Sequence, residues 1–357
     1  MTHDFLIIGG GIAGISAAAA LAPLGSVLLL EAEDALGHHA SGRSAATFEP
    51  YYGAPATVAL SHASRDMLEG MGVLAPLGVL VVAGPEDADA FAADAAAFHL
   101  DHLSPRDAQA LVPILNPAAI TQAGITQAAR DMDTDAMLQH FARDARALGA
   151  TLQPRAPVTG ISRRPHGWQV QAAGQTHDAR HLVNAAGAWG DAVARLAGVA
   201  PLGLQPYRRS MARLPLPAGV DPSGWPMFMG AGETWYAKRD AGALIVSPAE
   251  ADPMDPHDAW TDDMVIAEGL ARYEAMVTAP VTRVLATWAG LRSYLPDGTL
   301  AIGPDAADPG FLWLVGQGGQ GFQSACAAAQ LLGDLVAGRA PALPADIVAA
   351  LSPGRFA

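Results

Sequence analysis

The chain opens with a strand-length apolar run that leads directly into closely spaced glycines. Residues 4–8 (Asp-Phe-Leu-Ile-Ile) are followed by the pattern Gly-x-Gly-x-x-Gly over residues 9–14. An alanine-rich segment of helical character, residues 15–21, comes next, and a second apolar run, residues 26–30, ends at Glu31. This order of strand, glycine turn, helix, strand and acid predicts a βαβ unit that binds a dinucleotide.

Each part of this unit has a physical role. Gly9 permits the tight turn, Gly11 lets a pyrophosphate approach the backbone, and Gly14 lets the helix lie close to the strand. The helix N-terminus faces the phosphates. Glu31 is placed to accept ribose hydroxyls, and its charge argues against a 2′-phosphate and hence against NADP. The cofactor contacts predicted here are Gly9, Gly11, Ile12, Ala13, Gly14 and Glu31.

Composition limits the classes of protein that need to be considered. A length of 357 residues predicts two domains, and a net charge of −14 makes nucleic acid a poor partner. The single cysteine, Cys326, cannot form an internal disulfide, which fits a reducing, cytoplasmic compartment. Residues 5–30 carry no charge, but glycines and Pro23 interrupt them. We therefore expect no membrane span and leave peripheral association open.

The next segment distinguishes between dinucleotides. Residues 41–46 read Ser-Gly-Arg-Ser-Ala-Ala. The segment resembles one found after the second strand in the D-amino-acid oxidase family of flavoproteins, which includes glycine oxidase and sarcosine oxidase. The resemblance implies FAD as a non-covalent cofactor, contacted by Arg43, Ser44 and Ala45. Covalent attachment through Cys326 is not expected, because the surrounding pattern is absent.

Two later segments support the same resemblance, which extends to about Gly338. Residues 182–189 form an apolar run that ends in small residues, which in the family lies beside the adenosine half of FAD. Residues 311–321 repeat the strand–glycine–helix order, and in the family this junction lies against the flavin ring and the substrate. The further cofactor positions that the resemblance implies are Val158, Ala186, Gly187, Trp189, Gly290, Arg292, Gly318, Gly319, Gln320, Gly321, Phe322 and Gln323.

The flavin-contacting segments lie near the start, the middle and the end of the chain, so the cofactor domain is discontinuous. We expect an α/β, Rossmann-like FAD-binding domain and a second, mixed or antiparallel α+β domain that binds the substrate. The predicted FAD-binding domain comprises residues 1–80, 133–200 and 297–357. The predicted substrate-binding domain comprises residues 81–132 and 201–296.

The substrate end resembles bacterial D-arginine dehydrogenases within the family. Residues 201–210 and 287–293 carry the similarity. By this resemblance Arg209 and Arg292 hold the substrate carboxylate, to which a planar guanidinium is well suited. Arg208 should face the opposite way on a strand. The resemblance also places the hydroxyls of Tyr52 and Tyr236 near the carboxylate, and the Gly319 carbonyl near the amine.

The side-chain end of the pocket departs from that subfamily. Val79 stands where an acid meets the substrate guanidinium, and Thr47 stands where a histidine touches the substrate. Either Glu49 replaces the lost acid and a cationic side chain still binds, or the pocket is more apolar. Met227 and Met229, on the pocket wall by resemblance, favour the second hypothesis.

The resemblance implies FAD-dependent oxidative deamination of D-amino acids to 2-oxo acids and ammonia, with hydride transfer from Cα to flavin N5. No acid or base residue is identified, because the cofactor carries the hard chemistry. Oxidation of a 2-hydroxy acid, glycine or an N-methyl amino acid remains an alternative, as does a non-catalytic flavin-binding role. No metal is expected, since His38 and His39 are adjacent and lack ligand spacing. Oxygen, a quinone or another carrier could reoxidise the flavin.

Overall fold

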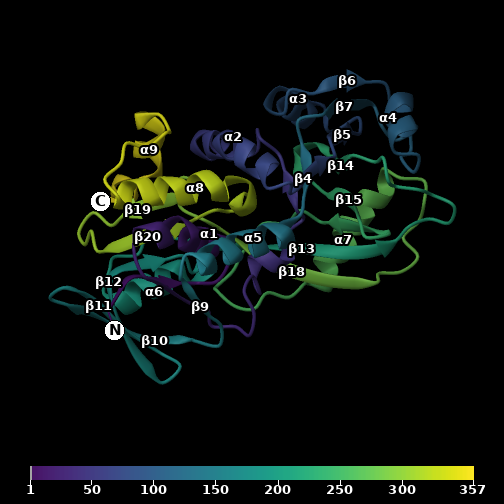
Figure 1. The fold of residues 1–357 in the computed structure, drawn as a ribbon. Coiled ribbons are helices and arrows are strands. Elements are labelled where there is room, and N and C mark those ends of the chain that lie inside the picture. The colour runs from purple at the N-terminus through teal and green to yellow at the C-terminus, as the bar shows by residue number, and fades with distance from the viewer. Residues whose placement is uncertain (1) are drawn as a thin grey trace.

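A computed structural model describes residues 2–357, in which two large sheets lie side by side (Figure 1). The first sheet has the order β10–β11–β12–β1–β2–β9, with β20 beside β12 and β19 beside β20. Its strands are β1 (Thr2–Ile8), β2 (Val27–Leu30), β9 (Thr151–Gln153), β10 (Val158–Arg164), β11 (Gly167–Ala172), β12 (Gln175–Asn184), β19 (Ala301–Pro304) and β20 (Phe311–Val315). Strands β1, β2, β9, β12 and β20 pair in parallel, and β9 forms one edge of the sheet.

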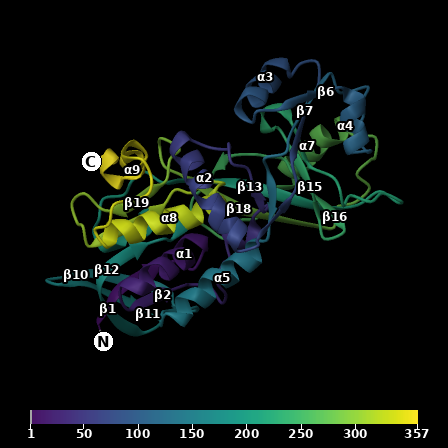
Figure 2. The same ribbon diagram turned by 45° about the horizontal axis from the view of Figure 1, so that its top comes forward.

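Helices cover both faces of this sheet. The helices α1 (Ile12–Leu21), α2 (Pro55–Gly70), α5 (Thr134–Ala147), α8 (Gly321–Val336) and α9 (Ala345–Leu351) lie on one side (Figure 2). Helix α6 (Gly190–Ala197) packs into the core layer on the other side (Figure 1). Ile7 packs into the first of these layers, whereas Leu6 and Ile8 pack into the second. A strand buried on both faces explains the unbroken apolar run in the sequence. The α/β fold class expected from the sequence is confirmed.

The second large sheet is mostly antiparallel and has the order β17–β13–β16–β15–β14–β5–β7–β6, with β18 along the other edge of β13. Its strands are β5 (Val79–Ala83), β6 (Asp101–Leu103), β7 (Gln122–Thr126), β13 (Gln205–Pro215), β14 (Met227–Gly230), β15 (Tyr236–Asp240), β16 (Ala243–Ser247), β17 (Asp252–Pro253) and β18 (Ala286–Tyr294). The helices in this half are α3 (Ala88–Ala97), α4 (Pro105–Leu111) and α7 (Asp263–Ala275). A small sheet, β3 (Thr47–Phe48), β8 (Arg130–Met132) and β4 (Leu74–Pro76), completes the strands described.

The first sheet draws its strands from three separate stretches of the chain, residues 2–30, 151–184 and 301–315. This is the discontinuous arrangement that the sequence predicts. The predicted boundary at residue 80 falls within β5, all of which pairs in the second sheet. No helix within residues 2–357 is both long and apolar enough to cross a lipid bilayer.

Two glycines bring α1 against the first sheet. A Cβ atom added at Gly9 would lie 2.4 Å from the carbonyl oxygen of Ala185, and one added at Gly14 would lie 1.8 Å from the carbonyl oxygen of Gly9. Gly9 also has a φ of +109°, which other residues rarely adopt. The glycine spacing is thus a packing requirement between β1, α1 and the end of β12.

We expect Gly14→Ala to lower the free energy of unfolding by about 3 kcal/mol, because the backbone must move to relieve the overlap. The matched control is Gly70→Ala, where an added Cβ would have no heavy atom within 4 Å. Urea unfolding followed by circular dichroism would measure both. A Gly14→Ala protein as stable as Gly70→Ala would contradict the packing explanation.

Candidate cofactor and substrate site

A cavity of about 430 Å³ lies where β1, β12 and β20 end. The loops that line it come from the start, the middle and the end of the chain, as the sequence predicts for a dinucleotide at the carboxyl edge of parallel strands. Predicted cofactor residues that line it are Gly9, Gly11, Ile12, Ala13, Glu31, Arg43, Ser44, Ala45, Val158, Ala186, Gly187, Trp189, Gly290, Arg292, Gly318, Gly319, Gly321 and Phe322. Gly14, Gln320 and Gln323 stand behind this lining, in the packing around α1 and α8.

Two helices begin at the cavity, and in neither does the side chain of the N-cap residue accept a hydrogen bond. Helix α1 follows Gly11 and helix α8 follows Gln320, and neither has an acidic residue in its first turn. Ser41 Oγ accepts the Ile12 backbone N–H at 3.0 Å. The remaining donors and the positive ends of two helix dipoles are therefore available to anionic groups. A pyrophosphate and an electron-rich ring system fit this pair of helix ends.

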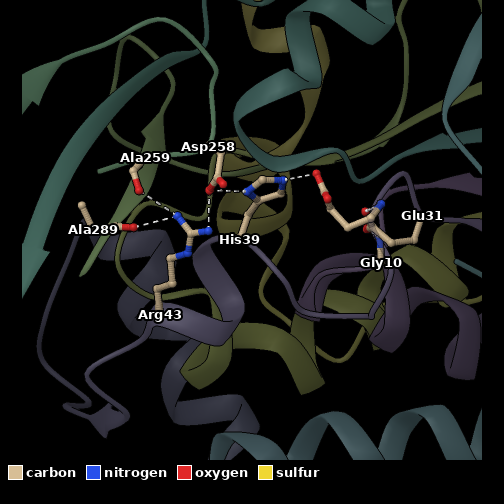
Figure 3. Close-up of polar contacts among 8 residues, drawn as sticks. Gly10, Glu31, His39, Arg43, Asp258, Ala259 and Ala289 are labelled. Atoms are coloured by element: carbon tan, nitrogen blue, oxygen red, sulfur yellow. Dashed lines mark hydrogen bonds and ion pairs between the residues drawn. The ribbon is translucent and has the colours of Figure 1, made fainter. Parts of the chain in front are cut away.

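Glu31 closes the far wall of the cavity. Its Oε2 accepts the Gly10 N–H at 2.6 Å and its Oε1 accepts the Glu33 N–H at 2.8 Å (Figure 3). These two bonds fix the carboxylate while each oxygen keeps a second acceptor position. The residue is placed to accept ribose hydroxyls, so the residues present fit the dinucleotide that the motif predicts.

Arg43 binds a segment that is distant in the sequence and forms part of the cavity wall (Figure 3). Its Nη1 donates to the carbonyl oxygens of Ala259 at 3.0 Å and Ala289 at 2.9 Å, and its Nη2 contacts Asp258 Oδ1 at 2.5 Å. The hydrogen bond from Arg43 holds the pKa of Asp258 below its usual value. Ala259 lines the cavity together with His257. The sequence did not reveal this wall, because it lies more than 200 residues from Arg43 along the chain.

The histidine pair lies at the rim of the same cavity. His39 Nε2 is 3.0 Å from Glu33 Oε1, and its Nδ1 is 3.7 Å from Asp258 Oδ1 (Figure 3). Together with His38, these groups place three potential metal ligands, Glu33, His38 and His39, within 4.8 Å of one another. The sequence did not show this group, because Glu33 stands apart from the histidine pair.

The two predicted carboxylate-binding arginines lie side by side. β13 and β18 pair in antiparallel register with Arg209 opposite Gly290 and Tyr207 opposite Arg292, so Arg209 and Arg292 share a face. Both line the cofactor cavity. Arg208 points away and binds Asp252 at 2.6 Å, as the strand alternation predicts.

An internal carboxylate lies between these arginines. Arg209 Nη1 is 2.6 Å from Glu233 Oε1 and Arg292 Nη1 is 3.6 Å from the same atom. Tyr52 donates its hydroxyl to Glu233 Oε2 at 2.8 Å. Three of the residues predicted to bind a substrate carboxylate thus converge on a carboxylate of the protein itself. The sequence did not single out Glu233.

The backbone holds Glu233 in an uncommon conformation, with a φ of +54° directly after Gly232 at +70°. Asp94 Oδ2 accepts the Gly232 N–H at 2.7 Å and fixes this turn. Burial alone would raise the pKa of Glu233, but the positive charges of Arg209 and Arg292 outweigh it and hold the pKa below its usual value. Glu233 is therefore an anion at neutral pH.

The remaining predicted substrate residues make contacts of their own. Tyr236 is buried, and its hydroxyl lies 3.7 Å from the sulfur of Met211, which lines the cofactor cavity. Thr47 Oγ1 lies 3.7 Å from the sulfur of Met227. A Cβ atom added at Gly319 would lie 3.0 Å from Arg292 Cζ, so the glycine lets the loop approach the guanidinium.

Glu49 lies apart from the cavity lining. Only 8% of the residue is exposed, its Oε1 accepts the Tyr51 N–H at 3.1 Å, and its Oε2 has no partner within the described chain. Gln323 braces its backbone by accepting the Glu49 N–H at 3.0 Å and donating to the Glu49 carbonyl at 3.1 Å. Burial raises the pKa of Glu49 from 4.5 to about 7. The acid is part of the packing between its loop and α8.

We expect this raised pKa to make stability depend on pH. Ionising Glu49 costs the folded state free energy, so stability is highest below pH 4.5 and is lost as pH rises through about 7. The cost at pH 8 is about 3 kcal/mol. Glu49→Gln removes it, so the variant should gain stability over the wild type between pH 5 and pH 8. Urea unfolding at both pH values measures the gain, with the exposed Glu86→Gln as control. An equal difference at both pH values would contradict it.

Comparison with known proteins agrees with this geometry. The model of the family described as FAD dependent oxidoreductase matches residues 4–335. A glycine oxidase of Pseudomonas putida is 28% identical over 367 residues, which cover 96% of each chain. The crystal structure of glycine oxidase from Geobacillus kaustophilus superposes with a TM-score of 0.84 at 21% identity, over 98% of both chains. An iminodiacetate oxidase from Chelativorans sp. superposes with a TM-score of 0.79 at 22% identity, again over 98% of both chains.

Proposed function

The chain belongs to the FAD-dependent oxidoreductase family, with FAD as its cofactor, and from this premise we propose that it oxidatively deaminates D-amino acids to 2-oxo acids and ammonia. The observation that carries the proposal is the pair Arg209 and Arg292, which meet on one carboxylate beside the cofactor cavity. A site that binds an internal carboxylate this way is suited to the carboxylate of an amino acid. The D configuration rests on the sequence resemblance.

The contribution of the protein is orientation. Bound FAD supplies the hydride acceptor. Arg209, Arg292 and the Tyr52 hydroxyl would fix a substrate carboxylate at three points, and this leaves Cα only a small range of positions. Burial by itself would lower the pKa of Arg292. The neighbouring Tyr236, Tyr52 and Glu233 outweigh this effect and raise the pKa above its usual value, so the guanidinium keeps its proton.

Glycine is the second candidate substrate, favoured by the name of the Pseudomonas putida relative. The same two arginines would hold its carboxylate. We further infer that the first and second sheets belong to the FAD-binding and substrate-binding domains respectively, with the boundary predicted at residue 80 moved to the start of β5, and that the protein is cytoplasmic. The electron acceptor, whether oxygen, a quinone or another carrier, would be found by assaying each with reduced protein.

The proposal is tested by mixing the holoprotein anaerobically with D-amino acids, L-amino acids, glycine, sarcosine and 2-hydroxy acids while following flavin absorbance. We expect D-amino acids to bleach the flavin and release ammonia. In Arg292→Met the second-order rate of bleaching should fall about 100-fold or more, because a buried charge pair to the substrate is lost. Arg213→Met, on the same strand as Arg209 but bound to Asp240, is the control. Bleaching by glycine or 2-hydroxy acids alone would overturn the substrate class.

The position of Glu233 leads to a prediction about ligand affinity, because a carboxylate ligand that binds Arg209 must displace Glu233 from it. We expect Glu233→Gln to bind propionate about tenfold more tightly than the wild type, because one charge-assisted bond no longer competes. Perturbation of the flavin spectrum measures the dissociation constant, and the exposed Glu268→Gln serves as control. Weaker binding by Glu233→Gln would show that this carboxylate supports the ligand rather than competes with it.

A further inference from the structure

A second cavity, of about 260 Å³, adjoins the first at Arg209 and Arg292, which line both. Its other walls are formed by Tyr207, Arg208, Glu250, Ala251 and Tyr294. The volume is several times the roughly 30 Å³ that one water molecule occupies in the liquid. This space therefore opens directly from the carboxylate-binding arginines.

A gap in the second sheet creates the cavity. β13 pairs with β17 at Tyr207 and Arg208, and with β16 only from Ala212 onward. The segment between β16 and β17 leaves the ladder with Ala249 at a φ of +57°. Glu250 follows that residue, and so its side chain lies in the gap and lines the cavity.

Glu250 is a buried carboxylate that makes no hydrogen bond. Its side chain is 7% exposed, and neither carboxylate oxygen has a hydrogen-bond partner among residues 2–357. Its ion-pair partner is Arg208, whose Nε lies 3.6 Å from Glu250 Oε1. That guanidinium already binds Asp252 at 2.6 Å, so one positive charge faces two carboxylates. A buried carboxylate in this state is stabilised by a further cation or donor.

The charges indicate which kind of group would fill the space. The Nε atoms of Arg208 and Arg209 are also without partners in the described chain, but both guanidinium groups bind carboxylates through their terminal nitrogens. Glu250 is the negative group of this cavity that makes no hydrogen bond, and it shares the charge of Arg208 with Asp252. The rings of Tyr207 and Tyr294 pack edge to face, with their centroids 6.0 Å apart. Aromatic walls of this kind can contact the alkyl part of a side chain or a cation.

We propose that this cavity is the outer part of the substrate site and that Glu250 binds a cationic group there, a primary ammonium or a guanidinium. The proposal rests on the proposed function and names the substrate class as amino acids with a basic side chain. The α-carboxylate would lie at Arg209 and Arg292, and the side chain would extend between the tyrosines to Glu250. Glu49, the acid considered from the sequence, lines neither cavity.

The kinetic test compares D-lysine with D-norleucine, which has the same carbon chain without the charge. In Glu250→Gln holoprotein we expect kcat/KM for D-lysine to fall at least tenfold while kcat/KM for D-norleucine stays within twofold. The control is Asp252→Asn, which also contacts Arg208 but does not line the cavity. An equal loss for both substrates, or no loss for D-lysine, would overturn the proposal.

A binding test separates this proposal from the proposed function, because it needs no turnover. Butylguanidinium is titrated into wild-type and Glu250→Gln holoprotein by calorimetry, with n-butanol as the uncharged comparison. Tight binding of butylguanidinium that is lost in Glu250→Gln would support the cation site even if no D-amino acid is oxidised. Equal binding to both proteins, or none to the wild type, would overturn it while leaving D-amino-acid oxidation to be judged by flavin bleaching.

Discussion

Close contact between backbones at the end of β1 determines how the rest of the site is assembled. Gly9 approaches Ala185 and Gly14 approaches Gly9 within distances that leave no room for a Cβ atom. This contact places the N-terminus of α1 beside the loop that follows β12. Because β12 also pairs with β20, the third glycine-rich loop and the start of α8 reach the same edge. Three remote stretches of sequence thus form one cavity with two helix ends.

Buried charge imposes the second constraint. Arg209 and Arg292 lie on paired strands in surroundings that penalise an uncompensated guanidinium, and Glu233 compensates both. Because Glu233 is a carboxylate, a ligand that replaces it beside these arginines should also carry a carboxylate. Glu250 presents the opposite situation, a carboxylate that makes no hydrogen bond and shares one cation, Arg208, with Asp252. The two carboxylates differ because Glu233 lies between two cations, whereas a break in the sheet leaves Glu250 with one shared cation and facing a cavity.

The segment around residues 43–46 joins the two halves of the molecule. Arg43 reaches from it to the carbonyl oxygens of Ala259 and Ala289. In the opposite direction, Lys238 of β15 donates to the carbonyl oxygens of Ala45 and Ala46, each at 2.8 Å. Burial lowers the pKa of Lys238, and the ion pair with Asp131 partly offsets that effect. A cation from each half thus binds carbonyl oxygens of the other half. These reciprocal contacts fix the cavity wall and also the position of one sheet relative to the other.

The sequence by itself determined the features that are local along the chain. The glycine spacing, the apolar runs and the acid at Glu31 specified the βαβ unit, because each depends on neighbours within about 30 residues. Strand alternation alone put Arg208 and Arg209 on opposite faces, since adjacent side chains of a strand point in opposite directions. Only the tertiary structure decided where Glu49 lies, that Glu233 faces the arginines and that Glu250 lines a cavity. These outcomes depend on a turn conformation, a gap between strands and contacts across roughly 20 to 250 positions, none of which leaves a periodic or spaced pattern in the sequence.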